Sequence, residues 1–224
     1  MSTAPLPPGV RLRVALMRHG QPEATAAGRC YGKLDVGLAK SGLAHVEACA
    51  EALRTHAAPS HIYASPRVRA VETAQVVRRG TAAELTIDER FAEIDFGEFE
   101  GQTYEEIERR HPEVYRQWMD TPTQVQFPGG ESFSVMQARV VAGLEEIRRR
   151  HRDTAVAIVS HGGVGRIVVA HLLGMAETDL FRLEQSYANL TVFDFYDEMP
   201  VMRCLNWTPT PAFGQATKLP STTA

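Results

Sequence analysis

The sequence predicts an α/β protein, a three-layer α/β/α sandwich built on a mostly parallel central sheet. Two observations predict this fold. Strand-like and helix-like segments alternate along the chain, which is the order that builds parallel sheets. The strand-like segments are also continuous apolar runs, as expected of strands that are covered on both faces. A sheet of this kind carries its ligand-binding residues beyond the carboxyl ends of the strands.

The first half of the chain supplies two strands and two helices. Residues 12–17 (LRVALM) form an apolar strand that ends before a glycine. Ser41 is expected to cap a helix whose apolar residues recur at helical spacing. His61–Ala64 is the next short strand, after which Ser65 provides an N-cap and Pro66 occupies the first helical position.

Two capping-box patterns mark the starts of helices in the middle of the chain. Thr103 and Glu106 have the required spacing, so a helix is expected from Tyr104. Ser134 and Gln137 repeat the pattern and open a long helix that ends in three consecutive arginines, which suit a helix C-terminus.

The last third of the chain contains the clearest buried strand, Thr154–Ser160 (TAVAIVS). A helix follows over residues 164–173, and Gly174 is expected to end it. Leu190–Tyr196 and residues 201–206 are predicted to form a closing pair of strands.

A single domain is predicted for residues 10–208, flanked by tails over residues 1–9 and 209–224 that are rich in Pro, Thr, Ser and Ala. A chain of 224 residues is long enough to bury a sizeable core in one α/β domain. Its 24 Lys and Arg against 27 Asp and Glu give a net charge of −3, which argues against a basic nucleic-acid-binding protein.

Compartment and cofactors follow from what the sequence lacks. No apolar run approaches the ~20 residues needed to cross a bilayer, and residues 1–10 lack the pattern of a signal peptide. Cys30, Cys49 and Cys204 are too few and too scattered for a disulfide framework, and no zinc-ligand spacing is present. We expect a cytoplasmic protein without metal or cofactor that binds neither membranes nor nucleic acid. The oligomeric state stays open, and a homodimer is compatible with the sequence.

Reactive side chains stand at the ends of the predicted strands. Arg18 and His19 follow the first strand, Arg67 follows the second and His161 follows the clearest one, while Glu93 lies in a further loop. Taken alone, a histidine after a strand is more often structural, and an arginine near a helix start is usually on the surface. The two histidines, however, follow the two most apolar strands, and each precedes a glycine that lets a ligand approach closely. This coincidence favours a shared site.

Such a cluster suits phosphoryl transfer. Two arginines can neutralise a phosphoryl dianion, and free N–H groups at a helix start add to the attraction. A neutral His19 beside them can attack phosphorus and form a phosphohistidine. His161 can donate a hydrogen bond to the transferred group as its charge develops. Glu93 can protonate the leaving alkoxide and later deprotonate water, so no step requires a metal.

The sequence resembles the histidine phosphatase superfamily, whose fold is phosphoglycerate-mutase-like. The resemblance runs in the family's order from about residue 13 to residue 206, through residues 16–21 (LMRHGQ), 64–74 (ASPRVRAVETA), 93–97 (EIDFG), 100–101 (EG), 129–132 (GGES) and 159–163 (VSHGG). It implies that His19 is the phospho-accepting nucleophile and Glu93 the general acid and base. It also implies that Arg18, Arg67 and His161 form the phosphate pocket.

The same resemblance implies substrate contacts from Gly20, Gln21, Thr25 and Gly162. Two positions depart from the family pattern: Pro22 stands where serine or threonine is common, and Thr25 stands where asparagine is common. Because proline has neither a backbone N–H nor a side-chain donor, it removes contacts at the rim of the phosphate pocket. The five central residues are all present.

Phosphatase activity is expected rather than mutase activity. Mutases of this family typically follow the acidic glutamate with Arg-His-Tyr-Gly and carry a longer insertion before the GGES segment. Here Glu93 precedes Ile-Asp-Phe-Gly, and only about thirty residues separate Gly101 from Glu131. A shorter insertion should let water reach the phosphohistidine.

The resemblance also suggests a substrate. Residues 30–38 (CYGKLDVGL), 115–118, 128–133 and 173–175 are similar to α-ribazole phosphatases, which implies hydrolysis of α-ribazole phosphate in cobalamin biosynthesis. The alternative is a phosphatase of broad specificity for sugar phosphates or phosphoglycerate. Tyr31, Tyr104 and Trp118 are candidates for an aromatic wall beside a base, although core packing is the simpler role for each.

Three other classes of protein explain less of the sequence. The glycines after residue 161 match part of a dinucleotide-binding fingerprint, but Val168 occupies the third glycine position. Ser160 beside a histidine suggests a serine hydrolase, but Ile158 stands where the nucleophile elbow needs glycine. A non-catalytic phosphoester-binding module would usually lack the nucleophile or the acid, and both are present.

Overall fold

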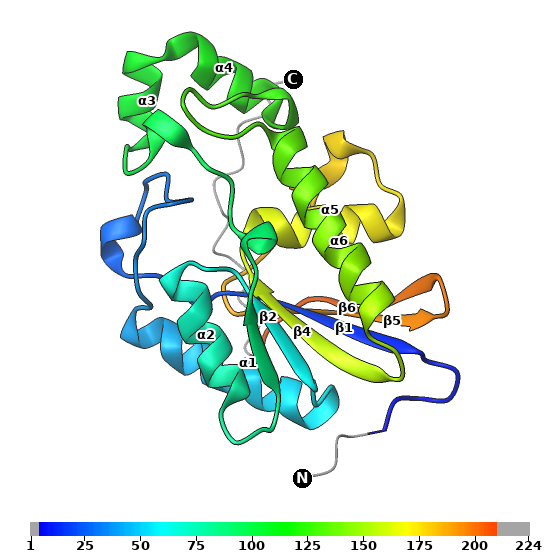
Figure 1. Cartoon of the computed structure of the whole chain (residues 1–224). Helices are drawn as coiled ribbons and strands as arrows, with labels where there is room; N and C mark the ends of the chain where they lie inside the picture. The colour runs from blue at the N-terminus through cyan, green and yellow to red at the C-terminus, as the bar shows by residue number, and fades with distance from the viewer. Residues whose placement is uncertain (1–4, 210–224) are drawn as a thin grey trace.

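The computed structural model describes residues 5–209, in which six strands form one mixed sheet of order β3-β2-β4-β1-β5-β6 (Figure 1). The strands are β1 (Leu12–Arg18), β2 (His61–Ala64), β3 (Glu84–Ile87), β4 (Thr154–Ser160), β5 (Leu190–Tyr196) and β6 (Met199–Trp207). The four strands from β3 to β1 are parallel, and β5 and β6 extend the sheet antiparallel to their neighbours. The predicted mostly parallel sheet is confirmed.

Helices cover both faces of this sheet. They are α1 (Lys40–His56), α2 (Val68–Arg78), α3 (Tyr104–Arg110), α4 (Pro112–Asp120), α5 (Phe133–Arg150) and α6 (Gly162–Leu173). Short 3₁₀ turns lie between them: η1 (Ala24–Ala26), η2 (Glu89–Phe91), η3 (Gly97–Phe99), η4 (Pro122–Gln124) and η5 (Glu177–Arg182). In Figure 1, α1 and α2 lie on one side of the sheet and α5 and α6 on the other, while α3 and α4 extend beyond it.

The central strands are buried on both faces, which explains their continuous apolar sequences. Leu16 and Ile158 belong to the core on the side of α5 and α6. Ala15 and Ala157, their neighbours along the chain, belong to the core on the side of α1 and α2. The alternation follows from the two-residue period of a strand, and it confirms the predicted three-layer architecture.

The register of the sheet brings three strand ends together. Arg18 at the end of β1 lies opposite Ser160 at the end of β4, and Ala64 at the end of β2 lies opposite Val159. The hydrogen bond from the Ser65 N–H to the Val159 carbonyl, 3.0 Å long, continues the ladder past β2. The residues after β1, β2 and β4 therefore emerge at one edge of the sheet.

Two of the predicted helix ends are confirmed. Thr103 Oγ1 accepts a hydrogen bond from the Glu106 N–H at 3.2 Å, and the Glu106 carboxylate accepts one from the Thr103 N–H at 2.8 Å, which completes the capping box of α3. Gly174 ends α6 with a φ of +64°, the left-handed conformation in which glycine is unstrained.

Three predicted N-caps are wrong by two residues. Ser41 lies inside α1, whose N-cap is Ala39. Ser65 and Pro66 precede the N-cap of α2, which is Arg67. The α5 N-cap is Ser132, whose hydroxyl accepts from the Val135 N–H at 3.3 Å, and Ser134 lies within that helix. Sequence spacing identifies residues able to cap, but the path of the preceding loop decides which of them does.

Strand β3 and helix α4 are not predicted by the sequence patterns. Edge strand β3 is mostly exposed and therefore lacks an apolar run. Helix α4 is only nine residues long and contains no fully buried residue, although Pro112 marks its first turn as proline often does.

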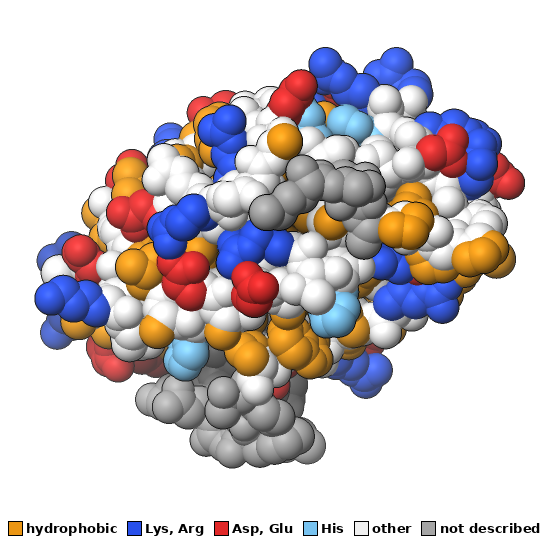
Figure 2. Space-filling view, turned by 90° about the horizontal axis from the view of Figure 1, so that it is seen from below, with side chains coloured by type: hydrophobic (Ala, Val, Ile, Leu, Met, Phe, Trp, Pro, Cys, Tyr) orange, Lys and Arg blue, Asp and Glu red, His pale blue; other side chains and the backbone are white. Residues whose placement is uncertain are grey.

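Residues 1–4 of the predicted N-terminal tail and residues 210–224 of the predicted C-terminal tail lie outside the described residues. Within residues 5–209, no helix has the length and apolar character of a membrane span. Basic and acidic side chains are interspersed on the face shown in Figure 2, with hydrophobic side chains between them. That face therefore carries no continuous patch of one charge.

Candidate active site

The two histidines singled out in the sequence are neighbours at the shared strand edge. His19 follows β1, and its N–H donates to the Ser160 carbonyl at 2.8 Å. His161 follows β4 and is the N-cap of α6. Their ring centroids lie 5.1 Å apart, and each residue is 1% exposed.

The hydrogen bond of His19 identifies its reactive nitrogen. Nδ1 lies 2.7 Å from the Gly20 carbonyl oxygen, which can only accept, so Nδ1 carries the hydrogen and Nε2 keeps its lone pair. Burial lowers the pKa of His19 well below its usual range, and the charges of Arg18 and Arg69 lower it further. His19 is therefore neutral, and the lone pair of its Nε2 is available to attack an electrophile.

His161 is prepared as a hydrogen-bond donor. Its Nε2 lies 2.6 Å from Ser65 Oγ, which itself accepts from the Arg67 N–H at 3.3 Å. We assign the Ser65 hydroxyl as the donor to Nε2, because its oxygen already accepts from the Arg67 N–H, and this places the hydrogen of the neutral imidazole on Nδ1. Burial lowers the pKa of His161 well below its usual range, with further contributions from the neighbouring His19 and arginines.

Several buried donors converge around these histidines. Among residues 5–209, six buried side-chain nitrogen or oxygen atoms lack a hydrogen-bond partner, and four of them are Arg18 Nε, Arg67 Nε, Arg69 Nε and His161 Nδ1. We call these four residues, together with His19, the cationic cup. Three guanidinium groups and an imidazole N–H are thus available to the oxygens of an anion, whereas a buried donor without any partner costs about 1–3 kcal/mol.

Arg69 belongs to the cup although the sequence analysis did not select it. It is fully buried on α2, and its guanidinium donates to the carbonyls of Tyr31, Gly32 and Leu34 at 2.9–3.0 Å. An available signal was its place on the inner face of α2, one turn before the buried Thr73. Arg67, the arginine chosen from the sequence, is the half-buried N-cap of the same helix.

Glu93 reaches the cup through the N-terminus of α6. Its two carboxylate oxygens accept from the N–H groups of Ile94 at 3.1 Å and Gly163 at 3.2 Å. On the same helical turn, a Cβ atom at Gly162 would lie 3.5 Å from the Arg18 guanidinium carbon. The carboxylate and the guanidinium of Arg18 therefore adjoin the same first turn of α6, as the sequence analysis expected for these residues.

The loop that carries Glu93 is held from two sides. The Ser160 hydroxyl donates to the Phe91 carbonyl at 2.7 Å, which ties the loop to the end of β4. Arg139 on α5 donates to the Ala92 carbonyl at 2.7 Å and forms a 2.7 Å ion pair with Glu131 of the GGES segment. These contacts fix the backbone on both sides of the carboxylate.

The four residues expected to contact substrate divide into two groups. The Gly20 carbonyl accepts a hydrogen bond from the His19 ring, and Gly162 lies against Arg18. The side chains of Gln21 and Thr25 are exposed, and within the described part of the chain no hydrogen bond joins either of them to the cup. The structure thus brings the two glycines into the site.

Two further side chains near the cup had no sequence signal. Arg166 on α6 donates to the Leu183 carbonyl at 2.9 Å, and burial together with the charge of Arg18 lowers its pKa to about 10. The ring of Tyr187 lies 4.0 Å from the Arg18 guanidinium carbon. Both residues come from segments whose position depends on the packing of α6 and the following turn.

The three aromatic residues considered for a wall beside a base lie in two different places. The Tyr31 ring lies 6.5 Å from the His19 ring. Tyr104 and Trp118 stack on each other at 5.4 Å, and Trp118 packs against Phe96, Phe99 and Phe127. The second pair is therefore part of the packing between α3, α4 and the neighbouring loops.

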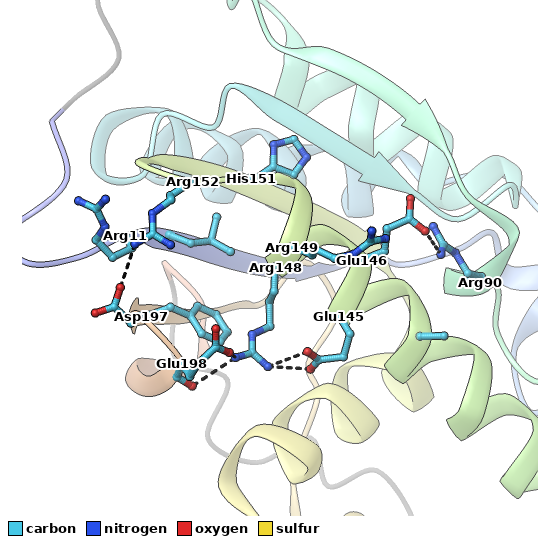
Figure 3. Close-up of a pocket in the computed structure, with 13 residues that line it drawn as sticks. Arg11, Arg90, Glu145, Glu146, Arg148, Arg149, His151, Arg152, Asp197 and Glu198 are labelled. Carbon is cyan, nitrogen blue, oxygen red and sulfur yellow. Dashed lines mark hydrogen bonds and ion pairs between the residues drawn. The ribbon is translucent and has the colours of Figure 1, made fainter.

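A separate pocket of about 600 Å³ opens at the opposite edge of the sheet, beside the start of β1 and the end of β5 (Figure 3). Its lining is rich in arginine, but the charges are paired: Arg148 binds both Glu145 and Glu198, and Arg90 binds Glu146. Within residues 5–209, no group of three His, Cys, Asp or Glu side chains is arranged to hold a metal ion. Four of the six buried atoms without a partner among residues 5–209 lie in the cationic cup instead.

Comparison with known proteins agrees with this geometry. A family model described as the histidine phosphatase superfamily (branch 1) matches residues 14–208. A bifunctional protein of Mycobacterium tuberculosis is 33% identical over 201 residues, or 89% of this chain, but the chain spans only 55% of that relative's length. Phosphoserine phosphatase 1 of Hydrogenobacter thermophilus is 32% identical over 198 residues, covering 88% of this chain and 93% of that protein.

A solved structure supports the fold. The α-ribazole phosphatase from Shigella flexneri superimposes with a TM-score of 0.80 at 23% identity, over 87% of this chain and 96% of that chain. At this identity the likeness concerns the fold alone.

Proposed function

The chain belongs to the histidine phosphatase superfamily (branch 1), and from that premise we propose that it is a metal-independent phosphomonoesterase acting through a phosphohistidine. One observation carries the proposal: a buried neutral histidine presents Nε2 beside four buried N–H donors that have no partner among the described residues. This arrangement combines a nucleophile with a binding site for the oxygens of a phosphoryl group.

In the first step, His19 Nε2 attacks the phosphorus of the ester. The bond between phosphorus and the ester oxygen breaks, and the leaving oxygen takes a proton from the carboxylic acid of Glu93. The products of this step are the free alcohol, a phosphohistidine and a Glu93 carboxylate. The hydrogen bond from Nδ1 to the Gly20 carbonyl holds the ring in the reactive tautomer throughout.

In the second step, the Glu93 carboxylate takes a proton from water, and the oxygen of that water attacks phosphorus. The bond between phosphorus and Nε2 breaks, which releases inorganic phosphate and restores neutral His19 and protonated Glu93. In both steps Arg18, Arg67 and Arg69 offset the charge on the transferred oxygens, and His161 Nδ1 donates a hydrogen bond to one of them.

We consider one specific substrate and one broader class of substrates. The similarity of residues 30–38 to α-ribazole phosphatases supports α-ribazole phosphate as the specific substrate. A broader specificity for small phosphomonoesters is the alternative, and it is supported by the 32% identity to a protein named as a phosphoserine phosphatase. Hydrolysis is preferred over phosphoglycerate mutase activity because only a short segment separates Gly101 from Glu131.

Two substitutions test the catalytic roles. His19→Ala is expected to lower kcat at least about a thousandfold because it removes the nucleophile. Glu93→Gln is expected to slow turnover while leaving the affinity for inorganic phosphate within about twofold, because the phosphate-binding donors remain. Release of inorganic phosphate and calorimetric phosphate binding measure the two effects.

The matched control is His171→Ala, since His171 is a partly exposed histidine paired with Glu145 on the far side of α6. It should hydrolyse substrate at the wild-type rate. A His19→Ala variant that also kept this rate would refute the assignment of the nucleophile.

A panel of phosphomonoesters separates the two substrate proposals. It should contain α-ribazole phosphate, phosphoserine, 3-phosphoglycerate, a sugar phosphate and p-nitrophenyl phosphate. A preference of more than about a hundredfold in kcat/KM for α-ribazole phosphate supports the specific enzyme. Comparable values across the panel support the broad one, and no phosphate release from any ester would favour a binding module.

A further inference from the structure

Two tyrosines from distant parts of the chain meet beside the nucleophile. Tyr31 lies in the loop before α1, and Tyr187 lies in the segment between η5 and β5. Their hydroxyl oxygens are 2.7 Å apart, so one hydroxyl donates to the other. The catalytic steps above use neither residue.

The pair faces the cationic cup. The rings of Tyr31 and Tyr187 lie 6.5 Å and 5.6 Å from the His19 ring. Each ring also packs on one of the cup's guanidinium groups: Tyr31 lies 5.0 Å from Arg69 and Tyr187 lies 4.0 Å from Arg18. Such cation–π contacts attract a cation to the face of an aromatic ring. The two rings therefore form a wall that adjoins both the nucleophile and the phosphate-binding cations.

The backbone on both sides of this wall is well anchored. The Tyr31 carbonyl accepts from Arg69 at 2.9 Å. A Cβ atom at Gly32 would lie only 1.8 Å from the Ile94 carbonyl oxygen, so the Tyr31 loop packs directly on the loop of Glu93. On the other side, the Ala188 N–H donates to the His19 carbonyl at 3.1 Å. The wall is thus fixed next to both groups that act on the ester bond.

The hydrogen-bonding capacity of the pair is only partly used. Each tyrosine has one O–H donor and two acceptor positions, and the bond between them consumes one donor and one acceptor. Within residues 5–209, no second hydrogen bond is formed by either hydroxyl. One O–H donor and several lone pairs therefore stay available at the wall. Burial raises the pKa of Tyr31, so its hydroxyl keeps its proton at neutral pH.

We propose that the Tyr31–Tyr187 pair is the leaving-group subsite and that it selects esters whose alcohol carries a second oxygen function close to the ester oxygen. This inference rests on the proposed phosphatase function. His19 attacks phosphorus from the side opposite the leaving oxygen, and Glu93 protonates that oxygen, so the alcohol has to extend along the loop on which Tyr31 packs. A hydroxyl, ring or carboxylate oxygen of the alcohol accepts from the free O–H of the pair. An alkyl alcohol leaves that O–H without a partner, and sites built on hydrogen bonds discriminate strongly in this situation.

The test compares two esters of similar size, sn-glycerol 3-phosphate and propyl phosphate. The wild-type protein should favour the glycerol ester in kcat/KM. In the double variant Tyr31→Phe/Tyr187→Phe, which removes both hydroxyls, the ratio of the two kcat/KM values should fall roughly tenfold, the effect of losing one neutral hydrogen bond. The double variant is required because either single substitution frees the remaining O–H from the bond between the two hydroxyls. Phenylalanine keeps the ring beside the guanidinium, so the inhibition constant of inorganic phosphate reports separately on the cup.

Tyr63→Phe is the matched control because the Tyr63 hydroxyl also forms a 2.8 Å hydrogen bond, with His151, at the other edge of the sheet. It should leave the ratio unchanged. A ratio that stays at the wild-type value in the double variant would overturn the subsite, as would an equal fall for both esters together with weaker phosphate inhibition. Failure of the wild-type protein to hydrolyse either ester, or any member of the larger panel, would instead overturn the proposed function.

Discussion

At the scale of single residues, the central property of the site is that two buried histidines are neutral. His19 and His161 are desolvated and surrounded by arginines, and both effects lower their pKa values well below the usual range. Cationic neighbours disfavour the protonated imidazolium, which has no lone pair with which to attack phosphorus. They therefore help to keep the imidazole in its neutral, nucleophilic form. In the proposed mechanism the same cations bind the phosphoryl group, so binding and activation would rely on one set of charges.

The neutral state of His19 and His161 in the folded chain predicts that the free energy of unfolding depends on pH. Below the ordinary histidine pKa of about 6.5 the unfolded chain binds protons at these two positions, whereas the folded chain does not. The free energy of unfolding should therefore decrease as the pH falls below about 6.5, by up to about 1.4 kcal/mol per pH unit for each histidine. Urea unfolding between pH 8 and pH 5.5 in phosphate-free buffer measures the slope.

The variant His161→Gln isolates the contribution of one histidine. Its free energy of unfolding should depend less steeply on pH than that of the wild-type protein in the same buffers, by up to about 1.4 kcal/mol per pH unit. An unchanged slope would mean that the buried imidazole of His161 is not held neutral in the folded state.

The donor set of the cup predicts independence from metal ions. Arginine N–H groups offer no lone pairs to a cation, and Arg18, Arg67 and Arg69 together repel one. Hydrolysis should therefore continue at the same rate in excess EDTA. Loss of activity that returns with added Zn²⁺ or Mg²⁺ would contradict the mechanism.

At the scale of elements, the first turn of α6 connects the residues that we assign to the proposed reaction. Its N-cap is His161, Gly162 lies against Arg18, and the Gly163 N–H binds the Glu93 carboxylate. A helix N-terminus attracts anions because its first N–H groups have no partner inside the helix. In this protein that attraction holds the Glu93 carboxylate, and in the proposed mechanism it also contributes to the binding of phosphate.

The close approach at Gly163 gives a sharp test of this arrangement. A Cβ atom there would lie 2.4 Å from Glu93 Oε1, so Gly163→Ala has to displace the carboxylate. We expect kcat to fall at least about tenfold while phosphate affinity changes little, since a misplaced acid affects the chemical step. Steady-state kinetics and calorimetric phosphate binding measure the two quantities.

Gly37→Ala serves as the control, because a Cβ atom there would meet its nearest neighbour at an ordinary 3.5 Å. Equal kcat values in the two alanine variants would show that the position of Glu93 does not depend on the space at Gly163.

At the scale of the whole molecule, the candidate site and a charged network that joins strands lie in different parts of the sheet. The cup occupies the edge where β1, β2 and β4 end, and a charged network joins strands away from it. Asp194 on β5 is buried and binds Arg13 on β1 at 2.6 Å and Arg203 on β6 at 2.7 Å. Burial acts to raise the pKa of Asp194, but the hydrogen bonds from the two arginines outweigh it, and the pKa is lowered.

Removal of this carboxylate should affect stability and spare the chemistry. Asp194→Ala leaves two guanidinium groups facing each other, and we expect it to lower the free energy of unfolding by about 3 kcal/mol. The kcat per folded molecule should stay near the wild-type value. Glu51→Ala is the control, since the 70% exposed Glu51 side chain on α1 forms a surface ion pair with Arg54 that should contribute less than about 1 kcal/mol. Similar losses in both variants would show that the buried network adds no stability.

Much of the architecture could be predicted because short-range patterns encode it. The apolar runs of β1 and β4 require burial on both faces, and Thr103 and Glu106 form their capping box from neighbouring residues. Features that depend on contacts between distant segments could not be predicted. Strand β3 is exposed at an edge, and nothing in the sequence distinguishes Arg69, which is buried on α2, from Arg67, which is the half-buried N-cap of that helix. Tyr187 reaches the site through the turn that follows α6.

The sequence by itself determined which chemical groups follow each strand: an imidazole and a guanidinium after β1, a second imidazole after β4, and a carboxylate in the loop after β3. Only the tertiary structure decided that β1, β4 and β2 are adjacent, that Arg69 faces the histidines, and that Tyr31 and Tyr187 meet. The physical reason is range. Propensities and caps act within a few residues, whereas the site depends on the strand order, which follows from burying both faces of one sheet.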